Sequence, residues 1–275
     1  MWTMQKRGPA DSSDGTQSIE RAIVLLRILA TRGRVGWGLS ELAGACGLKK
    51  ATAHRILARL ERERLVHRRS AGQHYFLGAM IGELSMSVHG LHAFVQEAQE
   101  FTGELARAAS LVAIVSLRSG DHFVVLARAK TTLLQGQLNE VGARRPLIST
   151  AGGAAILLGL ETGTQDRIIA SNRAELGTLG RSSIDAYIGM WTRSRELGYG
   201  LNSGDIAPGV HAVAVPVCNR SGEPFASIAL AGTAELLPLS RCDELVLTLR
   251  RQVVRLARIA AQLHPDLYDC REPAE

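Results

Sequence analysis

The first third of the chain is organised by apolar residues that recur at steps of three and four positions, the spacing of helices with one buried face. Ile19, Ala22, Ile23 and Leu26 repeat in this way after Ser18, a good N-cap residue. A shorter repeat follows a second cap residue, Ser40, and two β-rich runs come later. The pattern predicts helices at about 18–30, 40–46 and 49–60, then strands at 65–69 and 74–77 around a turn at 70–73.

Beyond residue 80 the pattern changes from short helices to one long helix and then to paired strands. Apolar residues fall on one side of the segment from Ile81 to about Ala108, which predicts a single linker helix. Runs rich in β-branched residues are hinged at turn sequences, as in hairpins. The remaining expected elements are strands at 111–118, 122–129, 210–218 and 224–231, and helices at about 150–160, 183–197 and 240–263.

Charge is distributed unevenly along the 275 residues. Residues 1–82 contain 14 Lys and Arg against 6 Asp and Glu, and the remainder contains 18 against 20, so a balance of +8 is followed by −2. The length suits two domains. A basic domain that meets a polyanion, joined to a near-neutral domain, explains the asymmetry, although solvated surface charge alone is the simpler alternative.

Several protein classes are excluded by what the sequence lacks. The four cysteines form no C-x-x-C pair and have no histidine at ligand spacing, so we expect reduced thiols, no zinc site and no disulfide framework. No apolar run reaches the roughly 20 residues of a membrane span, and the N-terminus has no apolar core of a signal peptide. No phosphate loop, dinucleotide fingerprint or metal cluster is present, so we expect a cytoplasmic protein without membrane, cofactor or metal.

The third predicted helix carries the main chemical signal. Its sequence, KKATAHRILARL from Lys49, crowds cations onto the first turn, where the helix dipole makes them slightly unfavourable. DNA phosphates would outweigh that penalty, and in a helix-turn-helix the second helix enters the major groove. The arginine of this helix is suited to guanine, and the following hairpin can act as a wing. The candidate DNA-binding residues are Lys49, Lys50, Thr52, His54, Arg55 and Arg59 in the helix, and Arg68 and Arg69 in the wing.

The alternative without a DNA-binding role is that this helix simply has a solvated basic face, which is the commoner explanation for any one amphipathic basic helix. His67 and His74 of the hairpin are open to the same two interpretations. The cap positions, the hairpin and the charge balance together favour DNA binding.

The same residues carry a family resemblance. SIERAIVLLRILA, LSELAGACGLKKATAHRILARLERERLV and YFLG resemble the N-terminal domain of the IclR family of bacterial transcriptional regulators. The family's recognition segment commonly reads L-P-K-S-T-V-H-R-L-L, which Lys50, Thr52, His54 and Arg55 match. Lys49, Ala51 and Ala53 replace its Pro, Ser and Val, so one expected phosphate contact is lost at Ala51 and Lys49 is left as a substitute.

The resemblance extends over nearly all of the chain. VGARRPLISTAGGAAILL and ELGYGLNSGDIAPGVHAVAVPVCNRSGEPFASIALAG are similar to the family's effector-domain segments. The resemblance implies an α+β protein: a winged helix-turn-helix joined by a linker helix to a GAF-like α/β domain with an antiparallel sheet, which binds small organic effectors. The effector residues that it implies are Thr150, Ala151, Gly153, Asn202, Ser203, Asp205, His211, Ala212, Ala229 and Ala231.

This chain departs from the family pattern at positions that affect which kind of effector it would bind. Gly204 and Asp205 stand where two acidic residues are common, and Ala154 replaces a frequent lysine. Alanines at 212, 229 and 231 replace a cysteine and two serines, which favours an aromatic or largely apolar effector with one polar end. The alternative is that these alanines only pack the sheet. Likewise, the start of the helix at Thr150 either receives an anion or packs tightly through small residues.

We expect no enzyme. His122 beside Asp121, or His211 with Ser203 and Asp205, would have to converge on a nucleophile, and no G-x-S-x-G elbow supports that. An enzyme with a DNA-binding appendage and an effector-independent architectural DNA binder remain as alternatives.

The sequence thus predicts a regulator that binds double-stranded operator DNA and a small organic effector and forms a homodimer or homotetramer. The sequence identifies neither the operator nor the effector, nor whether the regulator represses or activates. The expected divisions are a disordered arm at 1–17, the winged helix-turn-helix at 18–80, the linker helix at 81–109, the effector and oligomerisation domain at 110–265, and a tail at 266–275.

Overall fold

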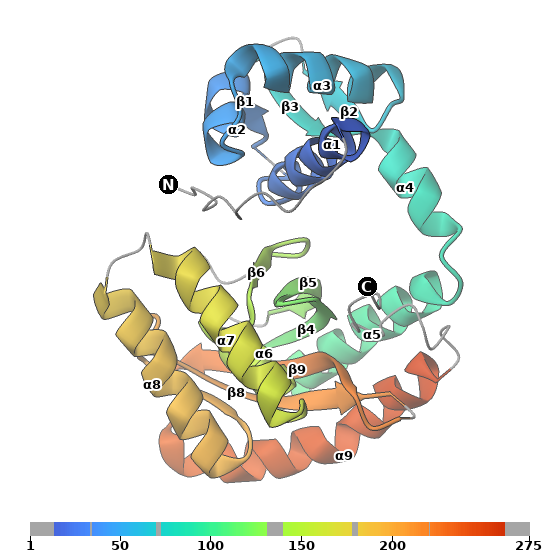
Figure 1. The fold of residues 1–275 in the computed structure, drawn as a ribbon. Helices are drawn as coiled ribbons and strands as arrows, with labels where there is room; N and C mark the ends of the chain where they lie inside the picture. Colours follow the sequence, from blue (N-terminus) through green and yellow to red (C-terminus); the bar gives the residue numbers. More distant parts are fainter. Residues whose placement is uncertain are drawn as a thin grey trace. The chain divides into compact units, whose positions relative to one another are not determined.

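The computed structural model describes residues 14–33, 35–69, 73–130, 140–177, 181–219 and 221–261. The chain divides into two compact units, residues 1–88 and residues 89–275. Figure 1 shows the elements of each unit.

The first unit has the predicted order of helix, helix, turn, helix and hairpin (Figure 1). Its strands form an antiparallel sheet in the order β1-β3-β2, so that β3 is central. The described elements are α1 (Asp14–Ala30), β1 (Trp37–Gly38), α2 (Leu39–Ala45), α3 (Lys50–Arg62), β2 (Val66–Arg68), β3 (His74–Leu77) and α4 (Ala79–Met86).

The core of this unit is built from the apolar stripes that the sequence indicated. Leu25 and Leu29 of α1, Leu42 of α2 and Leu57 of α3 are fully or almost fully buried in one cluster. Gly78, the last residue of the YFLG motif, lies so close to Arg64 that an added Cβ would overlap the Arg64 carbonyl oxygen. The motif therefore packs the wing onto the end of α3.

Three local predictions were wrong. Helix α1 begins at Asp14, not after Ser18, so residues 14–17 of the predicted arm are helical, and residues 1–13 lie outside the described part. Ser40 is the second residue of α2, because β1 pairs with β3 up to Gly38 and the chain enters the helix directly from that extended residue. The long linker helix is two helices, because Gly90 has a φ of 72° and interrupts the regular backbone.

The second unit is an antiparallel sheet with helices on both faces, which confirms the predicted α+β fold (Figure 1). The strand order is β6-β5-β4-β9-β8-β7. Helices α5 (Leu91–Ala109) and α9 (Cys242–Ala260) cover one face, and α6 (Ala151–Leu158), α7 (Thr162–Leu176) and α8 (Arg181–Leu197) pack on the other side. The strands are β4 (Val112–Ser119), β5 (His122–Ala129), β6 (Arg144–Pro146), β7 (Gly200–Ser203), β8 (Val210–Cys218) and β9 (Pro224–Thr233), with short 3-10 turns at Leu147–Ser149 and Leu239–Arg241.

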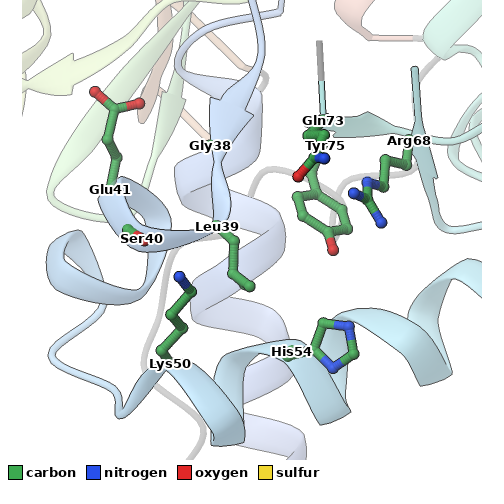
Figure 2. Close-up of a pocket in the computed structure, with 9 residues that line it drawn as sticks. All are labelled: Gly38, Leu39, Ser40, Glu41, Lys50, His54, Arg68, Gln73 and Tyr75. Carbon is green, nitrogen blue, oxygen red and sulfur yellow. The ribbon is translucent and has the colours of Figure 1, made fainter. Parts of the chain in front are cut away.

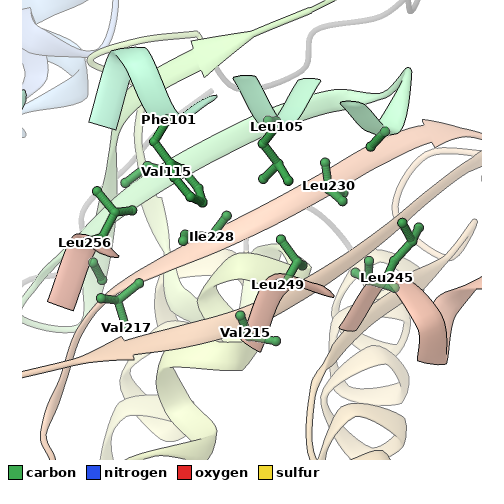
Figure 3. Packing of buried hydrophobic residues seen from close by; sticks show 14 of the residues in the cluster. Phe101, Leu105, Val115, Val215, Val217, Ile228, Leu230, Leu245, Leu249 and Leu256 are labelled. Atoms are coloured by element: carbon green, nitrogen blue, oxygen red, sulfur yellow. The ribbon is translucent and has the colours of Figure 1, made fainter. Parts of the chain in front are cut away.

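The two faces of this sheet differ in the size of their side chains. On the α5 and α9 face, Phe101, Leu105 and Leu249 pack against Val215, Ile228 and Leu230 of the strands (Figure 3). On the opposite face β8 and β9 present alanines to the small residues of α6, whereas β4 and β5 contribute larger side chains such as Ile114 and Phe123. Small side chains bring α6 close to the sheet, as Gly200 shows: a Cβ there would overlap the Ala151 carbonyl oxygen.

Helix α7 and strands β6 and β7 were not predicted. Helix α7 buries only Ile168, Asn172 and Leu176, and one of these three is polar, so its apolar stripe is too sparse to recognise. The Asn172 side chain nevertheless accepts a hydrogen bond from Ile148 N at 3.2 Å and donates one to Asp121 O at 3.0 Å. The buried Asn172 amide thus holds α7 in place by hydrogen bonds, whereas other helices are held by apolar packing.

The close approach at Gly153 generates a stability prediction. A Cβ at this position would overlap the Leu147 carbonyl oxygen, and the three nearest atoms are all backbone atoms of Leu147. We expect Gly153→Ala to lower the free energy of unfolding by at least about 2 kcal/mol. The control is Gly189→Ala in α8, where an added Cβ meets nothing within 4 Å; helix propensity should then stabilise by about 0.5–1 kcal/mol. Urea unfolding of both variants measures the difference, and equal effects would contradict it.

Candidate nucleic-acid interface and effector domain

Helix α3 separates a buried apolar face from an exposed cationic one. Ala53, Leu57 and Leu60 are buried and Ile56 packs beside them, whereas His54, Arg55 and Arg59 are exposed. Of the predicted DNA-binding residues, Thr52 is half-buried and Lys49, Lys50, His54, Arg55 and Arg59 are exposed. The structure therefore brings the helical candidates onto one accessible surface.

The charge of this surface is only partly neutralised within the unit. Arg59 pairs with Glu63 one turn later, with Nη2 and Oε1 2.6 Å apart. The first turn of α3 contains no acidic residue, and Lys49 precedes it in an extended conformation. Lys49 and Lys50 thus have no acidic neighbour in the first turn of the helix.

The two arginines of the wing are supported by aromatic rings. The guanidinium of Arg68 lies 5.7 Å from the centre of the Tyr75 ring, and that of Arg69 lies 4.7 Å from the Phe76 ring. The His67 ring stacks on Phe76, with ring centres 5.3 Å apart. Both arginines remain exposed. The rings therefore contact the guanidinium groups themselves and help to position them at the surface.

Two hollows flank α3, and His54 contributes to both. The first, which we call the wing hollow, is about 460 Å³ and lies between α2, α3 and the wing (Figure 2). The second is about 430 Å³ and is lined by Arg55, Ala58, Arg59 and Arg62 as well as His54. The wing hollow is lined by Gly38, Leu39, Ser40, Glu41, Lys50, His54, Arg68, Gln73 and Tyr75.

In the second unit, the alanines predicted to contact an effector share one face of the sheet. Ala212 is paired with Ala231 across β8 and β9, and Ala214 with Ala229. All four belong to the apolar cluster on the α6 side, where Ala151 of α6 also lies. The structure thus brings Ala151, Ala212, Ala229 and Ala231 together.

Thr150 and Gly153 have structural roles at the start of α6. Thr150 is the N-cap residue, and its Oγ1 accepts a hydrogen bond from Gly153 N at 3.1 Å. Gly153 itself is required by the close approach of Leu147. These contacts favour tight packing as the role of this segment.

Asp205 lies in a complete set of carboxylate-binding groups. Arg193 of α8 donates from Nη1 and Nη2 to the two carboxylate oxygens at 2.7 and 3.0 Å. The N–H and O–H of Ser203 both donate to Oδ2 at 3.1 Å. The Arg193 guanidinium, with the Ser203 amide, holds the pKa of Asp205 at about 2. Because the folded pKa is depressed, this contact stabilises the fold above about pH 4 and is lost as the pH falls through about 2.

Asn202 holds the adjoining loop. Its side chain is buried, donates to Val210 O at 3.0 Å and accepts from Ile206 N at 3.3 Å. The loop between β7 and β8 is therefore fixed at both ends, by Asn202 and by the Asp205 contact.

His211 does not join the alanine face. It alternates with Ala212 along β8, and its Nδ1 lies 2.8 Å from Leu237 O. Neither triad suggested by the sequence is assembled: Asp205 is held by Arg193, and His122 pairs with Glu175 at 2.9 Å instead of with Asp121. Asp121 pairs with Arg167.

Arg193 is the polar residue of this region that sequence reasoning missed. Its helix was predicted, but nothing in the sequence indicates which of the α8 cations turns toward β7. The neighbouring Ser194 is buried and its Oγ accepts a hydrogen bond from Leu201 N on the edge strand, which places this turn of α8 against β7. The role of Arg193 is determined by its position on the face of α8 next to the edge strand β7, and not by its residue type.

Within the described ranges, no helix is long and apolar enough to cross a membrane. The same residues include no group of three or more His, Cys, Asp and Glu side chains that could hold a metal ion.

Comparison with known proteins extends these observations. Residues 18–70 match the model of the IclR helix-turn-helix domain, and residues 86–258 match that of the bacterial transcriptional regulator IclR C-terminal domain. The glycerol operon regulatory protein of Streptomyces griseus is 30% identical over 221 residues, which cover 80% of this chain and 86% of the relative.

Solved structures share the fold. A putative IclR transcriptional regulator from Silicibacter superposes with a TM-score of 0.71 at 22% identity, covering 90% of this chain and 98% of that one. An IclR homologue from Microbacterium hydrocarbonoxydans, solved with 4-hydroxybenzoate, gives 0.66 at 17% identity and covers 88% and 98%. The chain belongs to the IclR family of DNA-binding bacterial transcriptional regulators.

Proposed function

We propose that the chain binds operator DNA by inserting α3 into the major groove, with Arg55 reading a base edge. The observation that carries this is the exposed cationic face of α3, which is fixed by burial of the opposite face. In this proposal His54 and Thr52 lie at the base edges or the nearest phosphates. Lys49, Lys50, Arg59, Arg68 and Arg69 neutralise phosphates on either side of the groove.

The short length of the recognition helix α3 supports a homo-oligomer. One helix of this length reads few base pairs, and helix-turn-helix proteins commonly bind two half-sites about one helical turn apart as dimers. We propose at least a dimer, with the linker region at 81–109 between the DNA-binding domain at 18–80 and the effector and oligomerisation domain at 110–265. The boundary between the compact units, after residue 88, falls inside that linker.

The effector is proposed to be an aromatic acid. The alanine face of β8 and β9 is apolar, and Arg193 offers a planar fork for a carboxylate, which Asp205 occupies in this structure. Asn202, Ser203, Thr150 and Gly153 lie in the elements around this region, whereas His211 contacts Leu237 on the other face of the sheet. The 4-hydroxybenzoate bound to the Microbacterium homologue has the same combination of ring and acid.

Sensing, not turnover, is the proposed role of the second unit. Ser203 and Asp205 are engaged with Arg193, and His211 is bonded to Leu237, so these three side chains do not form a catalytic triad. The effector would shift operator affinity by the ratio of its affinities for the two states of the oligomer. We place this activity in the cytoplasm, where its DNA target would be.

The Arg55 proposal is tested with a duplex that the wild-type protein selects from a randomised pool. We expect Arg55→Ala to weaken binding to this duplex by about 1–3 kcal/mol and to leave binding to scrambled DNA nearly unchanged. Gel-shift titrations at one salt concentration measure both. The matched control is Arg27→Ala, an exposed arginine of α1, which should not discriminate. Equal losses on both duplexes would show that Arg55 does not contact a base edge. The selected site also tests the dimer, because a site without two half-sites would argue against it.

The effector proposal is tested by thermal shift with aromatic acids and with glyoxylate- or pyruvate-sized acids. A ligand at 100 times its Kd should stabilise by about 2.7 kcal/mol, which is a shift of several degrees in Tm. We expect hydroxybenzoates to give this shift and Arg193→Gln to abolish it. Arg195→Gln, an exposed arginine on the same helix, is the control that keeps it. A response to the small keto acids at micromolar levels and none to aromatic acids would contradict the proposal.

A further inference from the structure

The Tyr75 hydroxyl in the wing hollow has no role in the folding of the first unit that the structure reveals. The side chain is 4% exposed, and its ring packs in the core with α1, α2 and α3. Among the described residues, none forms a hydrogen bond with its hydroxyl. The hydroxyl reaches the surface of the hollow, and phenylalanine would fill the same space in the core without it, so the hydroxyl is available to whatever enters the hollow.

The hydroxyl points into the wing hollow. Figure 2 shows it directed toward the side of His54, with Arg68 beside the ring and Lys50 on the opposite side of the hollow. Tyr75 is on the central strand of its sheet, paired with Trp37 of β1 and Arg68 of β2. This position fixes the hydroxyl relative to α3 far better than a loop would.

The chemistry around the hollow selects an anion rich in acceptor atoms. Lys50 and Arg68 have only donors, and the Tyr75 and Ser40 hydroxyls can donate. Glu41 is the acidic residue of the lining, and its carboxylate turns away from Lys50 and His54 (Figure 2), toward Arg32, whose Nη1 lies 3.6 Å from it. Hydrogen-bond donors from α3 and from the wing therefore converge on the hollow, and the Glu41 carboxylate does not neutralise their positive charge.

We propose that the wing hollow binds one backbone phosphate of the DNA, with the Tyr75 hydroxyl donating to a phosphate oxygen between Lys50 and Arg68. This inference rests on the proposed function and adds Tyr75 as a positioning residue that reads no base. The phosphate would tie the wing to the start of α3 and so set the angle at which α3 enters the groove.

The test compares wild type and Tyr75→Phe on the selected duplex and on scrambled DNA. Loss of a hydrogen bond to a charged group should weaken binding about tenfold. The loss should be equal on both duplexes, and the dependence on salt should be unchanged because no charge is removed. Arg68→Gln should also weaken both, but should reduce the slope of log K against log salt by about one.

A duplex with single methylphosphonate substitutions identifies the phosphate. At one position the neutral linkage should weaken wild-type binding, and there Tyr75→Phe should cause no further loss. Tyr199→Phe is the matched control, because it removes a hydroxyl that donates to Asp243 at 3.0 Å in the other unit, and it should leave DNA affinity unchanged. Thermal melts establish that each variant is folded, and Arg68→Gln tests the site through an exposed residue if Tyr75→Phe does not fold.

Three results would overturn the site while leaving DNA binding by α3 intact. They are unchanged affinity of Tyr75→Phe, a loss confined to the selected duplex, and a loss that persists in full at every methylphosphonate position. Stabilisation of wild type but not Tyr75→Phe by inorganic phosphate, with DNA affinity unaffected, would assign the hollow to a free anion and also overturn it. Failure of the wild type to bind any duplex would instead overturn the proposed function, and this site with it.

Discussion

Burial of Ala53, Leu57 and Leu60 is the constraint on which the DNA-binding surface depends. A helix advances about 100° per residue, so fixing these three against α1 and α2 fixes the direction of every other side chain on α3. Lys50 and His54 are then directed toward the wing hollow, and Arg55 toward the second hollow. Any change that rotated α3 would exchange the cationic face for the apolar one, so specificity for DNA is first a consequence of core packing.

The second unit follows the corresponding rule for strands, whose side chains alternate between faces. On β8, Ala212 and Ala214 face α6, whereas His211 and Val213 face the other way. The sequence contained this alternation but could not show which face was which, since both are apolar. His211 was therefore grouped with Ala212 from sequence, although adjacent strand residues cannot share a face. Two alanine pairs across β8 and β9 leave room for α6 to approach, as the glycine contacts of that helix require.

The parts of the fold that could be predicted are those with dense periodic signals. The helices and hairpin of the first unit and the long strands of the second were found because their apolar residues repeat many times. Helix α7 was missed because a buried Asn172 replaces one apolar position, and the break at Gly90 was missed because apolar spacing continues across it. Arg193 was missed for a different reason: its partner lies twelve residues away, across the turn from α8 into β7 and the loop beyond. Such a pairing depends on tertiary contact, which no local pattern encodes.

The Arg193–Asp205 contact also limits where effector affinity can come from. If an effector carboxylate displaces Asp205, one bidentate ion pair is exchanged for another, and the net electrostatic gain is small. The favourable free energy must then come from apolar area of the effector removed from water, roughly 25 cal/mol per Å². A small acid has little such area, whereas an aromatic ring has enough to make the exchange favourable. The released Asp205 would free one end of the loop that Asn202 still holds, so binding and loop conformation would be coupled through the same guanidinium.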